Sequence, residues 1–448
     1  MYPYIPTTEA DKKAMLERIG LSSTDELFQD IPDAFRLKEG LKLPPHKNEL
    51  EVTKWMRERA AENRGVDQLT CFLGAGAYDH YVPSVVDALI SRSEYYTAYT
   101  PYQPEISQGT LQYVFEFQTL ITRLTGMDVA NASLYDGGTS YAEAAIMACN
   151  VARRKEIVVS RSVNPQALEI LRTYCHGQSI KLIEVDVADG VTCLDDLQKK
   201  ITPETAGVIL QSPNFFGCIE DVEKAAEIAH SVKKCTMILA NDPFTLGVLK
   251  APSEMGVDVV VGEAQGLGLA LNFGGPYLGF IAAKEAYMRK LPGRLVGQTV
   301  DLDGKRAFVL TLAAREQHIR REKATSNICT NQGLMTLAAT IYMSTMGKSG
   351  MREVGLQAMS KAHYAFKKLT ASGKFKPVFQ HPFFMEFALT SDICPHKINQ
   401  ALLEAGIMGG YLLGRDFPEY PHAILYAVTE KRTKEEIDRL CEVLEGIE

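Results

Sequence analysis

The stretch VDVVVGEAQGLGLALNFGGPYLGF, residues 257–280, decides the fold that the rest of the chain predicts. A β-branched run at 257–261 and an apolar run at 277–283 flank a glycine-rich segment, which predicts strand, loop and strand. Glycines stand at positions 262, 266, 268, 274 and 275 of that loop. Because glycine permits positive φ and close approach of other atoms, the loop is more than an ordinary connection.

A buried strand predicted at 235–240 lies just upstream and ends in Asn241 and Asp242. In doubly wound α/β proteins, ligands bind at the carboxyl ends of the strands. An acid at one strand end and a basic nucleophile on the loop after the next strand would together form a pyridoxal phosphate site. Here the acid, Asp242, is present, and the loop at 262–276 contains no lysine.

Composition and charge exclude several classes of protein. The 448 residues are 46% hydrophobic and 23% charged, as expected for a globular protein with one large and one smaller domain. A net charge of −7 gives no broad attraction for nucleic acid or anionic membranes. The nine cysteines are widely spaced without a CxxC pair, so we expect neither a metal site nor a disulfide framework. The first residues resemble neither a secretory nor a transmembrane signal, which predicts a cytoplasmic protein.

Strands and helices alternate regularly between residues 156 and 240. This alternation predicts a mainly parallel sheet with helices on both faces, as in an α/β fold. We expect a helical arm at 1–65, a large α/β domain at 66–347 and a small C-terminal α/β domain at 348–448. The arm could wrap the body or a partner, or form plain surface structure. The predicted strands are 156–160, 180–186, 207–211 and 235–240, and later helices are predicted at 333–346 and 351–372.

Gly137, Gly138 and Thr139 follow Asp136 at the predicted start of another helix. Free backbone N–H groups and the helix dipole make such a start a site for an anion. Glycine turns and threonine caps also begin many helices that bind nothing, so this pattern alone does not decide between the two readings.

Two further stretches carry side chains suited to binding. EYYTAYTPYQPEISQG, at 94–109, holds four tyrosines on a proline-marked loop, which fits an interface, the wall of a pocket or packing beneath the loop. REQHIRREKATSNICTNQG, at 315–333, is basic at its start. It could hold a carboxylate or phosphate or pair with acids at a subunit contact, and a solvated charged face is the plainer reading.

The predicted architecture resembles the aspartate aminotransferase class of pyridoxal phosphate enzymes, fold type I. Nearly the whole chain resembles, more closely, glycine decarboxylase, the P-protein of the glycine cleavage system. The resemblance is to its N-terminal half, which many bacteria make as a separate chain. The stretches that carry it are TAYTPYQPEISQGTLQ (97–112), QSPNFFG (211–217), VVVGEAQGLGLALNFGGP (259–276) and REQHIRREKATSNICTNQG (315–333).

The resemblance implies that the lysine that binds pyridoxal phosphate belongs to the other half or subunit, ahead of a Gly-Gly-Pro segment. Alignment on 274–276 places Gln265 at that lysine position. A glutamine amide is not a nucleophilic amine and cannot hold the cofactor covalently. Asp242 and the turn formed by Gly137, Gly138 and Thr139 would then be remnants of a cofactor site or simply structural. No catalytic set is expected to be complete on this chain.

The hypothesis that follows is the subunit of glycine dehydrogenase (decarboxylating) that lacks the Schiff-base lysine. The implied partners are a paralogous lysine-bearing subunit 2 that binds the cofactor, the lipoyl carrier protein, and glycine, with two heterodimers forming a heterotetramer. One alternative is a self-sufficient pyridoxal phosphate transferase or lyase that uses Lys250 or Lys284, both poorly placed. Another is a catalytically silent scaffold for the partner. The candidates for residues that complete the partner's pocket or line the interface are Tyr99, Tyr102, Gln103, Gln108, Arg315 and His318.

Overall fold

The computed structural model describes residues 4, 6–37, 39–272, 274–328 and 330–447. Phe273 and Cys329, which belong to two of the stretches quoted above, lie outside these residues. The described chain divides into two compact units, one ending at Asn63 and the other beginning at Arg64. The further boundary expected between residues 347 and 348 stays a prediction.

The N-terminal unit contains helices α1 (Glu9–Ile19) and α2 (Glu49–Ala60). Each begins with a capping box, in which a polar side chain and an acid three residues later satisfy each other's backbone N–H groups. The pairs are Thr8 with Asp11 and Asn48 with Glu51. None of the residues in either helix is buried.

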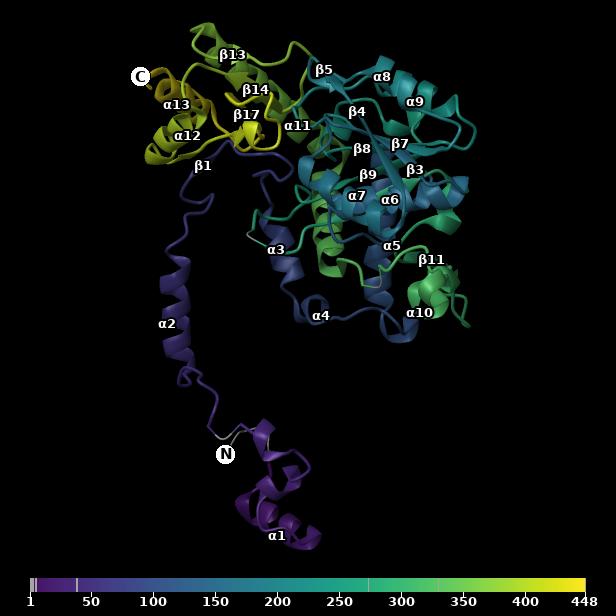
Figure 1. Cartoon of the computed structure of the whole chain (residues 1–448), viewed down its shortest axis with the longest axis vertical. Coiled ribbons are helices and arrows are strands. Elements are labelled where there is room, and N and C mark those ends of the chain that lie inside the picture. The colour runs from purple at the N-terminus through teal and green to yellow at the C-terminus, as the bar shows by residue number, and fades with distance from the viewer. Residues whose placement is uncertain (1–3, 5, 38, 273, 329, 448) are drawn as a thin grey trace. The chain divides into compact units, whose positions relative to one another are not determined.

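Among the described residues, the main sheet of the second unit has seven strands in the order β2-β10-β9-β8-β7-β3-β4. Figure 1 labels β3, β4, β7, β8 and β9 among them. Strands β3, β4, β7, β8 and β9 pair in parallel, and β10 runs antiparallel to both of its neighbours. This sheet confirms the predicted α/β fold. In chain order the strands are β2 (Val129–Ala130), β3 (Glu156–Ser160), β4 (Lys181–Val185), β7 (Thr205–Gln211), β8 (Thr236–Ala240), β9 (Val259–Glu263) and β10 (Gly279–Ala283).

Helices cover both faces of this sheet. Val158 of β3 faces a core that includes α5, α9 and α11, whereas Ile157 and Val159 face a second core with α6 and α7. Burial on both faces explains why these strands are continuously apolar instead of alternating. The covering helices are α5 (Gln108–Thr125), α6 (Gly137–Ala152), α7 (Pro165–Gly177), α8 (Leu194–Lys200), α9 (Val222–His230) and the first part of α11 (Gly333–Ala371).

A smaller sheet packs under its own helices near the C-terminus. Its described strands run in the order β13-β14-β17-β16, with antiparallel pairing throughout. A separate parallel pair joins β1 (Thr70–Cys71) to β15 (Ile407–Met408) and so connects distant parts of the chain. The remaining elements of this part are β13 (Lys376–Pro377), β14 (Glu386–Thr390), β16 (Tyr411–Leu412), β17 (Ala423–Ala427), α12 (Pro395–Glu404) and α13 (Lys434–Glu445).

Helix α11 joins the two cores through a break at Gly347. This glycine has φ +59° and ψ −175°, a conformation that a side chain would strain. Ala338 and Ala339, before the break, pack in the core of the main sheet, whereas Ala362 and Leu369 pack in that of the smaller sheet. The two helices predicted on either side of residue 347 are thus consecutive parts of one bent element.

Strands β11 (Leu295–Val300) and β12 (Arg306–Thr311) form a hairpin that the sequence pattern did not predict. Two glutamines of α5 hold this hairpin, and each uses its amide oxygen as an acceptor and its amide nitrogen as a donor. Gln118 accepts from the Val296 N–H at 2.9 Å and donates to the Val296 C=O at 3.0 Å. Gln108 makes the same pair of bonds with Phe308, both at 2.8 Å. Gln108, a predicted pocket residue, therefore anchors the hairpin.

No helix in the described ranges combines the length and apolar composition that a membrane span needs. The eight cysteines among the described residues are free thiols. The same part of the chain holds no cluster of three or more histidine, cysteine or acidic side chains arranged to bind a metal ion.

Candidate functional site

The candidate site lies at the carboxyl edge of the main sheet, where β8 and β9 end. Asn241 and Asp242 follow β8, and Gln265 lies two residues beyond β9. Parallel pairing of the two strands brings these ends to one edge. The helix start at Gly137 reaches the same edge because its N–H group bonds to Glu263. The structure thus brings together the residues predicted as the remnant of a cofactor site.

Gln265 is 1% exposed, and its amide is fully engaged with backbone groups. Its Oε1 accepts from the Tyr78 N–H at 2.8 Å. Its Nε2 donates to the carbonyl oxygens of Tyr78, at 3.1 Å, and Leu269, at 2.7 Å. The amide therefore pairs with both backbone groups of Tyr78 in the way that a neighbouring strand would. A lysine has no acceptor and could not bind the Tyr78 N–H.

The predicted anion turn at the start of α6 is occupied by carboxylates of the chain itself. Asp136 Oδ1 accepts from the Thr139 N–H at 2.7 Å, and Glu263 Oε2 accepts from the Gly137 N–H at 2.8 Å. A Cβ on residue 137 would lie 2.9 Å from the Glu263 Cβ, so the close approach requires glycine. The sequence analysis missed Glu263, and its only signal was an acid at the end of an apolar strand.

Asp242 stands at the strand end where the sequence predicts it. Its Oδ1 accepts from the Phe244 N–H at 2.8 Å. Burial raises the pKa of the Asp242 carboxyl, and the positive potential of His80 opposes that rise. The His80 ring packs 4.1 Å from the Phe244 ring, between centroids.

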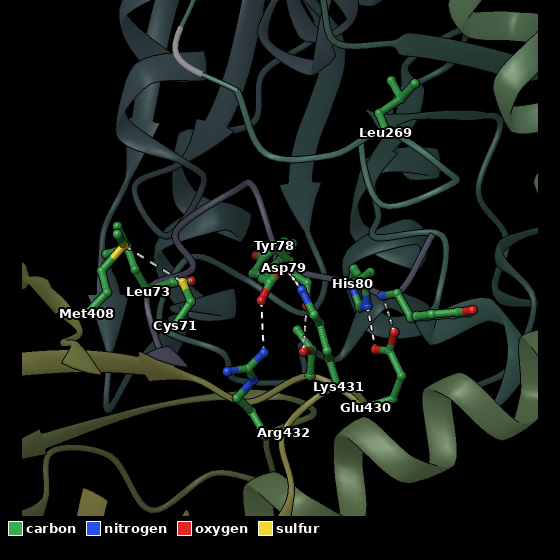
Figure 2. A network of polar contacts seen from close by, with 12 residues as sticks. Cys71, Leu73, Tyr78, Asp79, His80, Leu269, Met408, Glu430, Lys431 and Arg432 are labelled. Atoms are coloured by element: carbon green, nitrogen blue, oxygen red, sulfur yellow. Dashed lines mark hydrogen bonds and ion pairs between the residues drawn. The ribbon is translucent and has the colours of Figure 1, made fainter. Parts of the chain in front are cut away.

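A polar cluster joins residues 79–81 to the segment that follows β17 (Figure 2). His80 Nδ1 lies 2.6 Å from Glu430 Oε2. Asp79 accepts from Lys431 at 2.7 Å and from Arg432 at 2.9 Å. Asp79 and Arg432 are both buried, so charge compensation is essential there. This cluster fixes the backbone on which Gln265 depends.

Glu386, on β14, completes the wall beside Tyr78. Its two oxygens accept from the Ala75 N–H at 2.8 Å and from the Tyr78 hydroxyl at 2.7 Å. Burial, reinforced by the charge of Asp242, raises the pKa of Glu386 to about 7. Burial also raises the pKa of Glu263 to about 7 and that of the Tyr78 hydroxyl well above its ordinary value. We call the group of residues that meets at this edge of the main sheet, which includes Asp242, Glu263, Gln265 and Glu386, the crevice.

The residues of this crevice do not fit pyridoxal phosphate. The position expected for its lysine is held by the engaged amide of Gln265. The N–H groups expected to hold its phosphate are bonded to Glu263 and Asp136, whose negative charge opposes a second anion.

The two alternative lysines lie elsewhere. Lys284 Nζ pairs with Asp258 Oδ1 at 2.7 Å. Asp258 directly precedes β9, whereas Gln265 follows it, so Lys284 is at the opposite end of that strand. Lys250 pairs with the carboxylate of Glu223, a half-exposed side chain on α9. Neither lysine is placed to reach the crevice at Asp242.

A second group of predicted residues meets around Glu316, which is buried. Arg294, 2% exposed, lies 3.8 Å from Glu316 through its Nε, and its guanidinium carbon is 5.0 Å from the centre of the Tyr102 ring. His318 Nδ1 is 3.7 Å from Glu316 Oε2. Tyr102 therefore lies beside the Arg294 end of the Arg294–Glu316 pair, and His318 lies beside the Glu316 end. The sequence analysis missed Arg294, a single arginine before an apolar strand.

The other predicted residues differ in exposure. Tyr99 is 78% exposed, and Gln103 is also on the surface. Arg315 points inward, donates to the Leu291 carbonyl, and has a lowered pKa because of burial. We call residues 94–109 the tyrosine loop and residues 315–333 the basic stretch. The hydroxyl groups of Thr100 and Thr330 are 3.4 Å apart and so connect the tyrosine loop to the end of the basic stretch.

Comparisons with known proteins agree along the whole chain. A family model described as the glycine cleavage system P-protein matches residues 2–444. A relative named probable glycine dehydrogenase (decarboxylating) subunit 1, from Moorella thermoacetica, is 56% identical over 444 residues, 99% of each chain. A relative of the same name from Bacillus cereus strain B4264 is 51% identical over 448 residues, all of both chains.

Solved structures give the same result. The crystal structure of glycine decarboxylase (P-protein) of the glycine cleavage system, in inhibitor-bound form, is 42% identical with a TM-score of 0.91. It covers 99% of each chain. An aspartate aminotransferase from Thermus thermophilus, at 14% identity and a TM-score of 0.60, covers 84% of this chain and 99% of its own. At that identity it shows the fold alone, which is fold type I as expected.

Restoring a lysine at position 265 is expected to destabilise the chain. Gln265→Lys removes the acceptor for the buried Tyr78 N–H, so the free energy of unfolding should fall by about 2 kcal/mol. Gln298→Lys is the matched control because Gln298 is exposed on β11. Urea unfolding measures both variants. Equal stability of the two would contradict the role assigned to the Gln265 amide.

The raised pKa of Glu386 predicts that the free energy of unfolding depends on pH. The pKa of this carboxyl in the folded chain, about 7, lies above the ordinary 4.5, so its contribution to stability is complete below about pH 4.5 and is lost as pH rises through 7. The stability of wild type relative to Glu386→Gln should therefore fall by about 2 kcal/mol between pH 5 and pH 8. Denaturant unfolding at both pH values measures this difference. Glu404→Gln, at an exposed site, should show little change, and a flat profile for Glu386→Gln would refute the assignment.

Proposed function

The chain belongs to the glycine cleavage system P-protein family, and from this we propose that it is the subunit of a two-chain glycine dehydrogenase (decarboxylating) that holds no covalent cofactor. The observation that carries the proposal is the Gln265 amide, whose three backbone hydrogen bonds occupy the position at which the resemblance places the lysine. The chain's own crevice is therefore structural, and its contribution to the reaction comes from another surface.

The proposed partner is a paralogous subunit 2 that supplies the lysine and binds pyridoxal phosphate. The name subunit 1, carried by relatives that are 51–56% identical, supports a second subunit. In this proposal, glycine is decarboxylated on that partner and the aminomethyl group passes to the lipoyl carrier protein. We propose a heterotetramer located in the cytoplasm, in keeping with the bacterial relatives.

The surface offered to the partner is proposed to be the tyrosine loop with the charged group beside it. Tyr99, Tyr102 and Ile106 are 78%, 54% and 81% exposed. Exposed aromatic and apolar side chains concentrated on one segment are typical of an interface. Gln108 anchors the end of this loop, and Tyr102 lies over Arg294. The loop is thus held in place from below while its aromatic side chains face outward.

Arg315 and His318 have different parts in this proposal. His318 is exposed beside Glu316 and can meet an acidic group of the partner. Arg315 is turned inward onto the Leu291 carbonyl, so it supports the shape of the basic stretch. A second candidate function is a catalytically silent scaffold for the partner. It is favoured by the hydrogen bonds that the polar groups of the crevice make with the chain's own backbone. Activity measurements separate the scaffold from the catalytic subunit.

Glycine-dependent exchange of CO2 tests the proposal. This chain, its partner, and the mixture are each assayed with pyridoxal phosphate and the lipoyl carrier protein. We expect the mixture to be active and each separate chain to be inactive, because each chain holds only part of the active site. Absorbance of a lysine-bound cofactor in this chain alone would favour the self-sufficient enzyme. Full activity of the partner alone, unchanged by this chain, would favour the scaffold.

Tyr99 is expected to matter for the complex and not for the fold. Tyr99→Ala should lower the exchange rate of the complex by about tenfold or more, a loss of about 1.4 kcal/mol of transition-state stabilisation. The thermal stability of the isolated chain should stay unchanged because the side chain is 78% exposed. Tyr81→Ala, at a position 57% exposed and outside residues 94–109, is the matched control. An unchanged exchange rate for Tyr99→Ala would remove Tyr99 from the site.

A further inference from the structure

Helix α6 begins at the point where a phosphate would bind if the crevice held its expected cofactor. The helix is 16 residues long, and its dipole places positive potential at Gly137. The absence of a Cβ at residue 137 lets this start approach the Glu263 backbone, whose nitrogen would lie 3.1 Å from such an atom. The Gly137 N–H at the start of α6 is therefore directed at Glu263, at the end of β9.

The Glu263 side chain behaves as a ligand of this helix start. Its Oε2 accepts from the Gly137 N–H at 2.8 Å. Its Oε1 accepts from the N–H groups of Gln265 and Leu278, both at 2.9 Å. Three backbone donors from three segments thus converge on one carboxylate, an arrangement typical of the binding of a small anion.

Asp136 adds a second carboxylate at the same helix start. Its Oδ1 accepts from the Thr139 N–H at 2.7 Å. Two acids at one helix terminus satisfy its positive potential, and they repel any further anion. The two carboxylates at the start of α6 therefore disfavour the binding of phosphate there.

We propose that Glu263 is the built-in anion of this crevice, occupying at the α6 N-terminus the place of a cofactor phosphate. The crevice is thereby closed to phosphate and to pyridoxal phosphate, and the carboxylate ties α6, β10 and the glycine-rich loop together. Glu263 fills this place in the chain by itself, whether or not the chain serves in a glycine-decarboxylating complex.

Thermal unfolding of the full-length chain with inorganic phosphate tests it, against sodium chloride at matched ionic strength. Measurements are made at about pH 8, above the pKa of about 7 for Glu263. Wild type should show no saturable response. Glu263→Ala should unfold at a lower temperature and regain about 2 °C or more with phosphate, since the released N–H groups bind the added anion.

Glu386→Ala is the matched control, because it also removes a crevice carboxylate that accepts a backbone N–H, away from any helix start. It should lose stability and show no phosphate response. Saturable stabilisation of wild type by phosphate would overturn the proposal, whether or not Glu263→Ala folds. A folded Glu263→Ala that responds no more than wild type would overturn it as well.

Discussion

A buried loop must find a hydrogen-bond partner for its backbone N–H and C=O groups, and this requirement organises the carboxyl edge of the main sheet. Gln265 meets it there by pairing its amide with both backbone groups of Tyr78. Gln108 and Gln118 pair their amides in the same way with residues of the β11–β12 hairpin. Glu263 and Glu386 supply further acceptors. Side chains that a cofactor site would direct at a ligand here support the chain's own backbone.

The same constraint links the crevice to the C-terminal part of the chain. Glu430 and Arg432 bind His80 and Asp79, and the preceding residue, Tyr78, is the one that Gln265 holds. Buried ion pairs add little net stability, but removing one member is costly, so they favour one arrangement over others. We infer that they fix the register of residues 78–81 between the smaller sheet and the glycine-rich loop.

Local pattern was enough to predict the parallel sheet, the acid at position 242 and a helix after the glycine turn at 136–138, because each depends on neighbouring residues. The helix begins at Gly137, two residues before the predicted start at Thr139. The alignment could place Gln265, but not its partner, since Tyr78 is 187 positions away. Glu263 was missed for the same reason. The β11–β12 hairpin was missed because Gly297 interrupts its pattern and glutamines from α5 hold it in place.

The engaged amide of Gln265 also has an evolutionary consequence. Glutamine and lysine codons can differ by one base, so a change between the two is mutationally short. Here the surrounding residues oppose that change, because a lysine would leave the Tyr78 N–H without its acceptor, and Glu263 already binds the N–H group at the start of α6. Holding a cofactor covalently at this position would require replacements at several residues, each unfavourable alone. Such mutual dependence keeps position 265 from changing to lysine in a single step.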